Sequence, residues 1–444
     1  MSFFNLSAGQ SGNWKGYEKI ILRFFILYFI LLAVPLDWKF YRHLFSTFSN
    51  GFNFYDLFIL SKYMPVFFSL EGFGSWIVAA IIAAIGSAAW PYFERRAINY
   101  DTLYYWLRVI LRYRLAAGVI AYGLIKIFPM QMPYPSLSNL HTNYGDFFPW
   151  KIYYHTLAVA PGYEVFLGLV EVIAGVLLIN RRTVTFGSGI LIGYTGNVFA
   201  ANIAYDGAEL AYSAYLFLIA VFLFAYDAPR LYNLLVLRKY ATASKFRPVF
   251  SERGIRNIRF ALKSVFSLFI LLLGAATYAN FANAPYKLPA TPGLKGSYGF
   301  YNVREFRLNN RIIPYSTTDP NRWQNVVFEK WATISIKIAK PLRLDASSGE
   351  GYYEADIDRN FESSGVGGRR YYSFSADTTA NTLLLKNKNK HHAKETFQLQ
   401  FSRPNDSTII VKGVNEKNDS IYAVMDKITR KYMLIEGRRK PVKL

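Results

Sequence analysis

The chain has 444 residues, of which 52% are hydrophobic and 18% aromatic, and it contains no cysteine. This composition is unlike that of an ordinary soluble domain and favours a membrane protein, while the lack of thiols excludes a disulfide framework, a Cys-ligated metal or iron–sulfur site and covalently attached haem. The formal net charge of +22 fits either nucleic-acid binding or basic loops beside anionic lipid, so the positions of the charges decide between these classes.

Seven apolar runs, each close to the roughly 20 residues that a bilayer-spanning helix needs, predict an α-helical polytopic membrane protein. They cover residues 18–37, 74–93, 103–128, 159–180, 184–204, 209–227 and 260–281. Any one run fits a buried helix of a large soluble core, but so many in one region would be hard to cover with polar surface. We therefore expect about seven transmembrane helices.

Lys and Arg concentrate in alternate connections between these runs. The basic connections include residues 15–23, 95–114, 181–182 and 229–259. Because cytoplasmic loops carry the basic excess, the N-terminus is predicted to be cytoplasmic, and an odd number of helices places the C-terminal segment in the periplasm of a bacterial inner membrane. No nucleic-acid partner is expected. The first run lacks a small-x-small cleavage site and is predicted to be a retained helix rather than a signal peptide.

Within the predicted membrane helices, polar residues recur at helical spacing. Tyr122 and Lys126 are four residues apart on the third helix, and Glu164, Gly168 and Glu171 share one face of the fourth. An ionisable group at mid-bilayer must face the bundle interior and find a partner, while a glycine beside it lets another helix approach closely. These residues are therefore expected to point inward.

The fifth predicted helix carries Asn197, Asn202 and Asp206 in its outer half. Helix direction places them near the depth of Lys126 and Glu171, so the sequence predicts one polar pocket that opens toward the outer side. The alternative is a set of interhelical hydrogen bonds, worth roughly 0.6 kcal/mol each, with a Lys–Glu pair that only fixes helix packing.

From about residue 290, apolar and polar residues alternate, as in "ATISIKIAK", "TFQLQFS" and "STIIVKGV". Turn signals such as "RLNNR" and "NEKNDS" separate the stretches, which predicts an antiparallel meander of about eight strands. A closed, lipocalin-like barrel with room for an apolar ligand and a solid β-domain both fit this pattern. In either case Ile334, Ile336, Ile338, Ile409 and Val411 should face one interior.

Three blocks of the helical region, "LRYRLAAGVIAYGLIKIFPMQMP", "GYEVFLGLVEVIAGVLLINRRT" and "NVFAANIAYD", resemble the DoxX-like membrane proteins, in particular long members from Bacteroidota with an extramembrane tail. The resemblance covers residues 100–235 and implies a four-helix membrane core linked to quinone-coupled oxidation of sulfur compounds. The extra helices and the basic stretch depart from the family's core pattern. The matched positions are Tyr122, Gly123, Lys126, Gln131, Pro133, Glu164, Glu171, Arg181, Arg182, Asn197, Asn202, Tyr205 and Asp206.

The candidate residues for ligand binding or proton handling are Tyr122, Lys126, Gln131, Glu164, Glu171, Asn197, Asn202, Tyr205 and Asp206. No catalytic residue is assigned. His391 and His392 lie in a charged loop, which is typical of a solvated turn rather than a metal pair, and His155 is either an interfacial residue or a proton carrier. The sequence has no dinucleotide, P-loop, hydrolase or zinc-protease motif, so no haem, flavin or metal site is expected.

Together these features predict an inner-membrane protein that binds a small amphipathic ligand, a quinone or a lipid, and serves a redox or cell-envelope system. Two alternatives stay open: a subunit of a quinone-coupled oxidoreductase in which Glu171 and Lys126 move protons, and a structural subunit that docks through its β-domain. Membrane lipid and other envelope or redox subunits are the expected partners. The predicted domains are residues 1–100 (two helices and an external loop), 101–235 (the four-helix core), 236–285 (a basic cytoplasmic segment and the seventh helix) and 286–444 (the β-domain).

Overall fold

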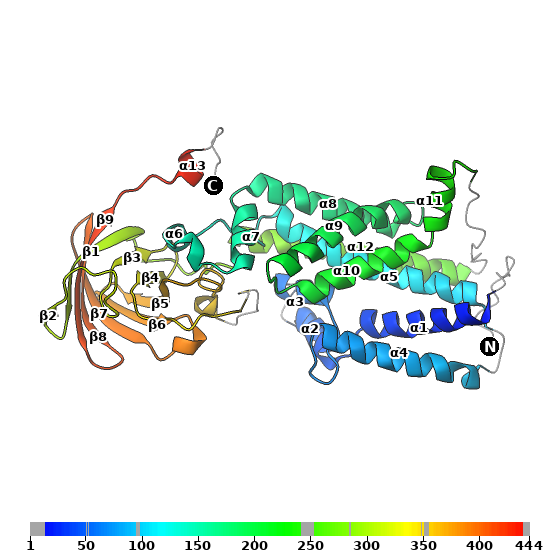
Figure 1. Cartoon of the computed structure of the whole chain (residues 1–444), viewed down its shortest axis with the longest axis horizontal. Coiled ribbons are helices and arrows are strands. Elements are labelled where there is room, and N and C mark those ends of the chain that lie inside the picture. The colour runs from blue at the N-terminus through cyan, green and yellow to red at the C-terminus, as the bar shows by residue number, and fades with distance from the viewer. Residues whose placement is uncertain are drawn as a thin grey trace. The chain divides into compact units, whose positions relative to one another are not determined.

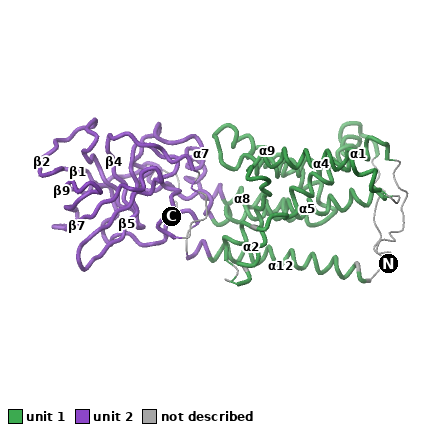
Figure 2. Tube along the Cα trace, turned by 90° about the horizontal axis from the view of Figure 1, so that it is seen from below, with its two compact units in different colours: residues 1–128, 165–279 green, residues 129–164, 280–444 purple. Residues whose placement is uncertain are grey.

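The computed structural model describes residues 14–49, 51, 53–94, 98–240, 253–283, 286–347, 349 and 355–437. The chain forms two compact units, one of residues 1–128 and 165–279 and the other of residues 129–164 and 280–444 (Figure 2). These units divide the chain differently from the predicted boundaries at residues 101, 236 and 286, because residues 129–164 group with the strands. Arg95, Arg96 and residues 241–252, on which part of the topology prediction rests, lie outside the described residues.

Helices make up the first unit, and several of them run side by side (Figure 1). In chain order they are α1 (Gly16–Ala33), α2 (Trp38–Ser49), α3 (Phe54–Lys62), α4 (Phe73–Phe93), α5 (Tyr100–Ile127), α8 (Pro161–Ile179), α9 (Val184–Ala204), α10 (Leu210–Ala225), α11 (Ala228–Leu235) and α12 (Arg253–Asn283). α1 packs against α4 and α5, and α10 packs against α9 and α5. All the predicted apolar runs are helical, whereas α2 and α3 lie where an external loop was expected.

Four helices in the described part of the chain are long and apolar enough to cross a membrane: α4, α8, α9 and residues 256–283 of α12. α10 and α11 would together make a fifth span, bent by 62°. α1 and α5 are too rich in charged residues to meet the same standard. The structure therefore supports a membrane protein, while the predicted total of seven spans is not confirmed.

The arginines of α5 are bonded inside the helical unit. Arg112 donates to the carbonyls of Leu178 and Ile179 at 2.9 and 2.7 Å, where α8 ends. Arg114 donates to the carbonyl of Ser61 at 2.7 Å, in the last turn of α3. The final carbonyls of a helix lack intrahelical partners, and a cation there also opposes the negative end of the helix dipole. Both arginines, which the sequence analysis counted in the basic connection at residues 95–114, thus cap neighbouring helices.

The second unit is built on a closed antiparallel barrel (Figure 1). Its strands are β1 (Gly299–Leu308), β2 (Arg311–Ile312), β3 (Asn325–Phe328), β4 (Thr333–Lys337), β5 (Arg370–Asp377), β6 (Thr382–Asn387), β7 (Thr396–Asn405), β8 (Thr408–Asn415) and β9 (Ser420–Ile428). Neighbouring strands follow chain order from β3 to β9, β3 also pairs with β1, and β1 pairs with β9 to close the barrel, while the short β2 extends β1. This arrangement confirms the predicted antiparallel meander.

Large side chains fill the interior of the barrel. Ile334, Ile336, Ile409 and Val411 belong to its buried core, and Ile338 packs against that core, as the alternation predicted. Aromatic side chains also meet there: the ring centres of Trp323, just before β3, and Phe397 of β7 lie 5.5 Å apart, and those of Tyr301 and Phe328, on the paired strands β1 and β3, lie 5.4 Å apart. Their packing favours a solid barrel over the ligand-holding one.

Residues 129–164 form a cover on the outer face of this barrel. The cover contains α6 (Leu137–Leu140), the 3-10 turn Tyr144–Asp146 and α7 (Pro149–Ala158). α6 contacts β3, and Phe147 makes an isolated β-bridge with Val366. The cover explains why β4 is buried on both faces, with Thr333 and Ser335 as fully enclosed as Ile334. Short elements Asp356–Asp358, Lys390–His392 and α13 (Met433–Glu436) complete the described part of the unit.

Gly413 of β8 pairs with Leu399 of β7 and leaves no room for a side chain between the strands. A Cβ at this position would lie 1.9 Å from the Gln398 carbonyl oxygen, so Gly413→Ala must push the two strands apart. Overpacking of this kind costs about 1–3 kcal/mol. We expect faster amide hydrogen exchange in β7 and β8 of the full-length protein, measured by mass spectrometry. Gly145→Ala, whose Cβ would meet open space, should leave exchange unchanged, and a Gly413→Ala variant that exchanges like wild type would contradict the register.

Candidate functional site

The helical unit contains an ion pair between α5 and α8. The Lys126 ammonium donates to a Glu171 carboxylate oxygen at 2.7 Å, and the two side chains are only 6% and 7% exposed. Tyr194 of α9 adds a hydrogen bond to the same carboxylate. Two charges this deep in a protein are tolerated because their mutual attraction and additional hydrogen bonds offset the cost of removing them from water.

Glycines allow α5 and α8 to come close enough for this pair. A Cβ on Gly168 would lie 2.6 Å from the Gly123 carbonyl oxygen and 2.8 Å from the Lys126 Cβ. A Cβ on Gly123 would in turn lie 3.0 Å from the Glu171 Cβ. Because the crowded atoms include backbone, side chains at these positions would force the helices apart. The spacing of Gly168 and Glu171 along α8 thus places a contact point and a charge on the same face.

The Tyr122 ring lies between two ion pairs. Lys126 Nζ is 5.5 Å from the centre of this ring, and Lys62 Nζ is 5.7 Å from it. Lys62 forms an ion pair with Glu209, and its side chain is 34% exposed. Cations at this range are attracted by the negative face of an aromatic ring. The arrangement therefore connects a partly exposed ion pair to a buried one through a single tyrosine.

Further aromatic side chains surround Tyr122. The ring centre of Phe58 lies 5.3 Å from that of Tyr122, and the ring centre of Tyr212 lies 5.5 Å from it. Lys62, Tyr194, Glu209 and Tyr212 were not among the predicted site residues. These four residues come from different segments of the chain, so no helical spacing in the sequence connects all of them. Lys62 ends α3 and Glu209 directly precedes the strongly apolar α10, and this position beside an apolar run was the one available signal.

The other predicted residues do not gather at this pair. Asn197, Tyr205 and Asp206 are exposed in the chain, and the Asn202 amide donates to the Val198 carbonyl of its own helix at 2.9 Å. Asn197 and Asn202 are five residues apart, about 140° around a helix, so they cannot share a face. The predicted pocket is thus represented by Tyr122, Lys126 and Glu171, while the polar end of α9 points elsewhere.

Gln131 and Glu164 belong to the other unit, together with the cover of the barrel. Both are buried there, and Glu164 accepts a hydrogen bond from the Met132 backbone at 3.1 Å. The sequence placed Glu164 and Glu171 on one face of the fourth predicted helix, and both were candidate site residues together with Lys126. In the helical unit it is Glu171 that holds this lysine.

A second buried polar cluster attaches the cover to the barrel. Glu329, which follows β3, accepts hydrogen bonds from the Ser138 backbone at 2.7 Å, from the Ser138 hydroxyl at 2.6 Å and from the Leu137 backbone at 3.3 Å. Burial, together with the nearby charge of Glu362, raises the pKa of Glu329 to about 7. Glu329 therefore changes its charge near neutral pH while it holds the first turn of α6.

The neighbouring charges of this cluster are also enclosed. Glu362 pairs with Lys388 at 3.2 Å, with both side chains 1% exposed, and accepts from the Trp331 indole at 2.8 Å. Arg369 donates to the Ser335 hydroxyl at 2.9 Å, and burial lowers the pKa of Arg369 to about 10. These enclosed groups, together with Glu329, connect the cover to the barrel.

Two of the described histidines, His141 and His155, belong to the cover of the barrel. Burial and the charge of Lys151 lower the pKa of His155 to about 3, and burial lowers the pKa of His141 to about 4, so both rings stay neutral at physiological pH. His141 stacks on Phe300 with 3.7 Å between the ring centres. Within the described ranges, the acidic and histidine side chains form no group of three or more that could hold a metal ion.

Comparisons with protein-family models, with curated proteins and with solved structures found no match to the chain. The resemblance to DoxX-like proteins therefore stays a prediction from the sequence blocks.

The raised pKa of Glu329 predicts how the barrel unit responds to pH. Because the folded state holds this proton more tightly than the unfolded chain, the associated stabilisation is complete below the ordinary glutamate pKa near 4.5 and is lost as the pH rises through the folded-state pKa of about 7. Glu329→Gln removes that titration, so the opening free energy of β3–β5 should fall less between pH 5 and 8 than in wild type. Hydrogen exchange of the full-length protein, corrected for the intrinsic pH dependence of exchange, measures this difference.

Glu395→Gln provides the control of opposite sign. Arg370 and its hydrogen bonds hold the pKa of Glu395 below its usual value, so that carboxylate stabilises at higher pH and its contribution is lost on acidification. The same pH dependence in Glu329→Gln and wild type would contradict the assignment.

Proposed function

We propose that the chain is a DoxX-like membrane protein whose helical unit binds the polar head of a small amphipathic molecule, a quinone or a lipid, at Tyr122, Lys126 and Glu171. The observation that carries this proposal is the buried Lys126–Glu171 pair, set against an aromatic ring that faces a second, more accessible ion pair. Well-packed apolar residues stabilise a helix contact as well as a buried ion pair does, so its presence favours a role beyond packing.

The chemistry of the pair suits a head group with carbonyl, hydroxyl or phosphate oxygens. The Lys126 ammonium has three N–H donors and uses one in its hydrogen bond to Glu171, which leaves donors for a ligand oxygen. Glu171 accepts from a ligand hydroxyl, and the rings of Tyr122, Phe58 and Tyr212 offer a flat apolar surface for a ring or an acyl chain. The partly exposed Lys62–Glu209 pair marks the side from which the head group arrives.

In a quinone-linked system, Glu171 and Lys126 would take up and release protons while a partner subunit supplies the redox centre. A lipid ligand would instead assign the chain to envelope maintenance. We further propose, from the basic connections in the sequence, that the helical unit lies in the bacterial inner membrane with its N-terminus in the cytoplasm and the barrel in the periplasm.

A second candidate function is a structural subunit that docks onto an envelope complex. The interior of the barrel is filled by a large core of aliphatic and aromatic side chains, which favours this alternative for the β unit, because such a barrel presents mainly its surface to a partner. The two proposals concern different units of the chain and are compatible with each other.

The ligand proposal predicts the outcome of a lipid-extract mass spectrum of the purified protein. Wild type should carry one quinone or lipid species above the bulk phospholipid. Glu171→Gln should fold with normal yield yet lose most of this species, because a hydrogen bond to a charged group contributes about 1.5–3 kcal/mol, or roughly tenfold or more in affinity. Asn197→Ala, on an exposed face of α9, should retain it. Ligand retention in Glu171→Gln, or an extract that holds only bulk phospholipid, would refute the site.

The topology proposal is tested by fusions at the C-terminus. A periplasmic barrel predicts an active alkaline-phosphatase fusion and a dark cytoplasmic-type fluorescent fusion. The reverse result would place the barrel in the cytoplasm.

A further inference from the structure

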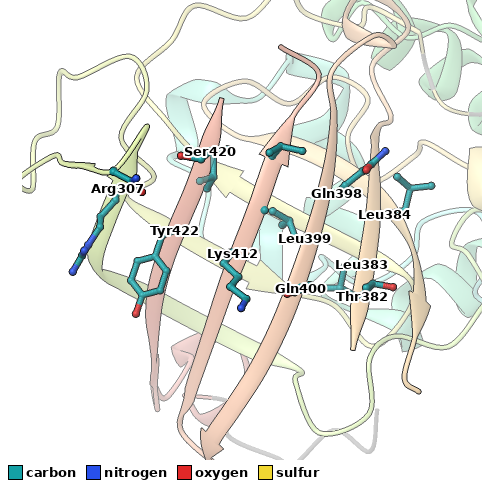
Figure 3. Close-up of a pocket in the computed structure, with 14 residues that line it drawn as sticks. Arg307, Thr382, Leu383, Leu384, Gln398, Leu399, Gln400, Lys412, Ser420 and Tyr422 are labelled. Carbon is teal, nitrogen blue, oxygen red and sulfur yellow. The ribbon is translucent and has the colours of Figure 1, made fainter. Parts of the chain in front are cut away.

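The outer face of the barrel carries a hollow that the proposed membrane function does not use. It lies over strands β1, β9, β8, β7 and β6 and has a volume of about 780 Å³ (Figure 3). Its fourteen lining residues include Arg307 and Lys412 but no aspartate or glutamate. The hollow is a mixed surface whose charged side chains are both basic, and five apolar residues also line it: Leu383, Leu384, Leu399, Val414 and Ile421.

Strand register arranges the side chains of this hollow in a row across the sheet. Arg307 pairs with Tyr422, Tyr422 with Lys412, Lys412 with Gln400, and Gln400 with Thr382. These five residues come from five neighbouring strands, which lie about 4.8 Å apart, so the row extends about 19 Å. Figure 3 shows Tyr422, Lys412, Gln400 and Thr382 in this order on adjacent strands.

A second row runs parallel to the first, two residues along each strand. In it Ser420 pairs with Val414, Val414 with Gln398, and Gln398 with Leu384. The residues between the rows, such as Leu399 and Gly413, belong to the inward-facing positions of the same strands. The two rows line the same hollow, which we call the channel because it crosses five strands, a shape that fits a chain-like ligand.

The side chains of the channel offer hydrogen-bonding amides, two cations and one aromatic ring. Gln398, Gln400 and Lys412 are exposed and able to donate hydrogen bonds, and the amides also accept them. The Arg307 guanidinium lies 5.2 Å from the centre of the Tyr422 ring and also pairs with Glu305, which holds it at the end of the row. Lys412, in the middle of the row, carries the charge best placed for a ligand.

We propose that this channel binds an anionic polysaccharide, a hydroxyl-rich chain that bears carboxylates. Amide side chains pair with neighbouring hydroxyls as both donors and acceptors, a tyrosine ring packs against the apolar face of a sugar, and the two cations pair with carboxylates. The outer face of a β-barrel binds oligosaccharides in other folds as well.

Other large partners fit this channel less well. Protein interfaces are depleted in lysine and serine and enriched in several aromatic residues, whereas one tyrosine lines this channel beside amides, hydroxyls and a central lysine. Single-stranded nucleic acid is bound through a series of aromatic platforms on which successive bases stack, and the lining residues include only Tyr422.

The test uses the full-length protein in detergent with sodium alginate, a polymer of uronic acids, as the probe and neutral dextran as its uncharged counterpart. Binding is measured by titration calorimetry or biolayer interferometry. We expect alginate to bind, dextran to bind far more weakly, and alginate affinity to fall with added salt. Lys412→Gln and Tyr422→Ala should each weaken alginate binding roughly tenfold, the loss of one charge-assisted hydrogen bond or one aromatic contact.

Lys417→Gln is the matched control, since it removes an equally exposed charge from the β8–β9 turn, outside the channel. It should bind alginate as wild type does, and so should Glu171→Gln, which alters the helical unit alone. The proposal is overturned if alginate fails to bind, if Lys417→Gln loses as much affinity as Lys412→Gln, or if a thymidine oligonucleotide binds as tightly as alginate and competes with it.

Discussion

The Lys126–Glu171 ion pair constrains how α5 and α8 meet in the helical unit. Either charge alone would cost several kcal/mol in surroundings that exclude water, so the two helices must meet where the pair forms. The contact in turn requires Gly123 and Gly168, because any Cβ at these positions collides with backbone atoms of the other helix. Packing and electrostatics therefore specify the same approach of α5 to α8, and neither can change without the other.

A related constraint operates on the barrel, with hydroxyls in place of glycines. Thr333 and Ser335 point outward from β4, yet both are fully enclosed because the cover lies on them. Outward positions that stay in water carry Lys386, Gln398 and Gln400 instead. Small hydroxyl side chains leave room for the cover and provide partners for buried charges. In this barrel, covered outward positions on the strands thus carry small hydroxyl residues, and exposed outward positions carry long polar residues.

Local periodicity made much of this fold predictable. The apolar runs give the helices, the period-two pattern gives the barrel with its interior residues, and the spacing of Gly168 and Glu171 gives the contact face of α8. Contacts made by residues without a periodic pattern could not be predicted in this way. α2 and α3, the cover over the barrel and the Lys62–Glu209 pair all depend on long-range partners that a single sequence does not reveal.

The polar end of α9 shows a different limit. Depth in a membrane follows from helix direction, but the face on which a residue lies depends on helix rotation, and Asn197 and Asn202 differ by about 140° in that respect. Agreement in depth alone was therefore insufficient to place them in one pocket. The Asn202 amide finds its partner in its own helix, which removes the need for a partner across the bundle.

The basic residues that give the net charge of +22 have several different roles in the structure. Arg112 and Arg114 cap helices and Lys126 neutralises a buried carboxylate, so these charges are engaged inside the helical unit. Lys412, by contrast, projects from a strand in the middle of a polar row. Whatever binds there is selected by the spacing of that row across the sheet, because a diffuse positive field acts on every polyanion alike and distinguishes none of them.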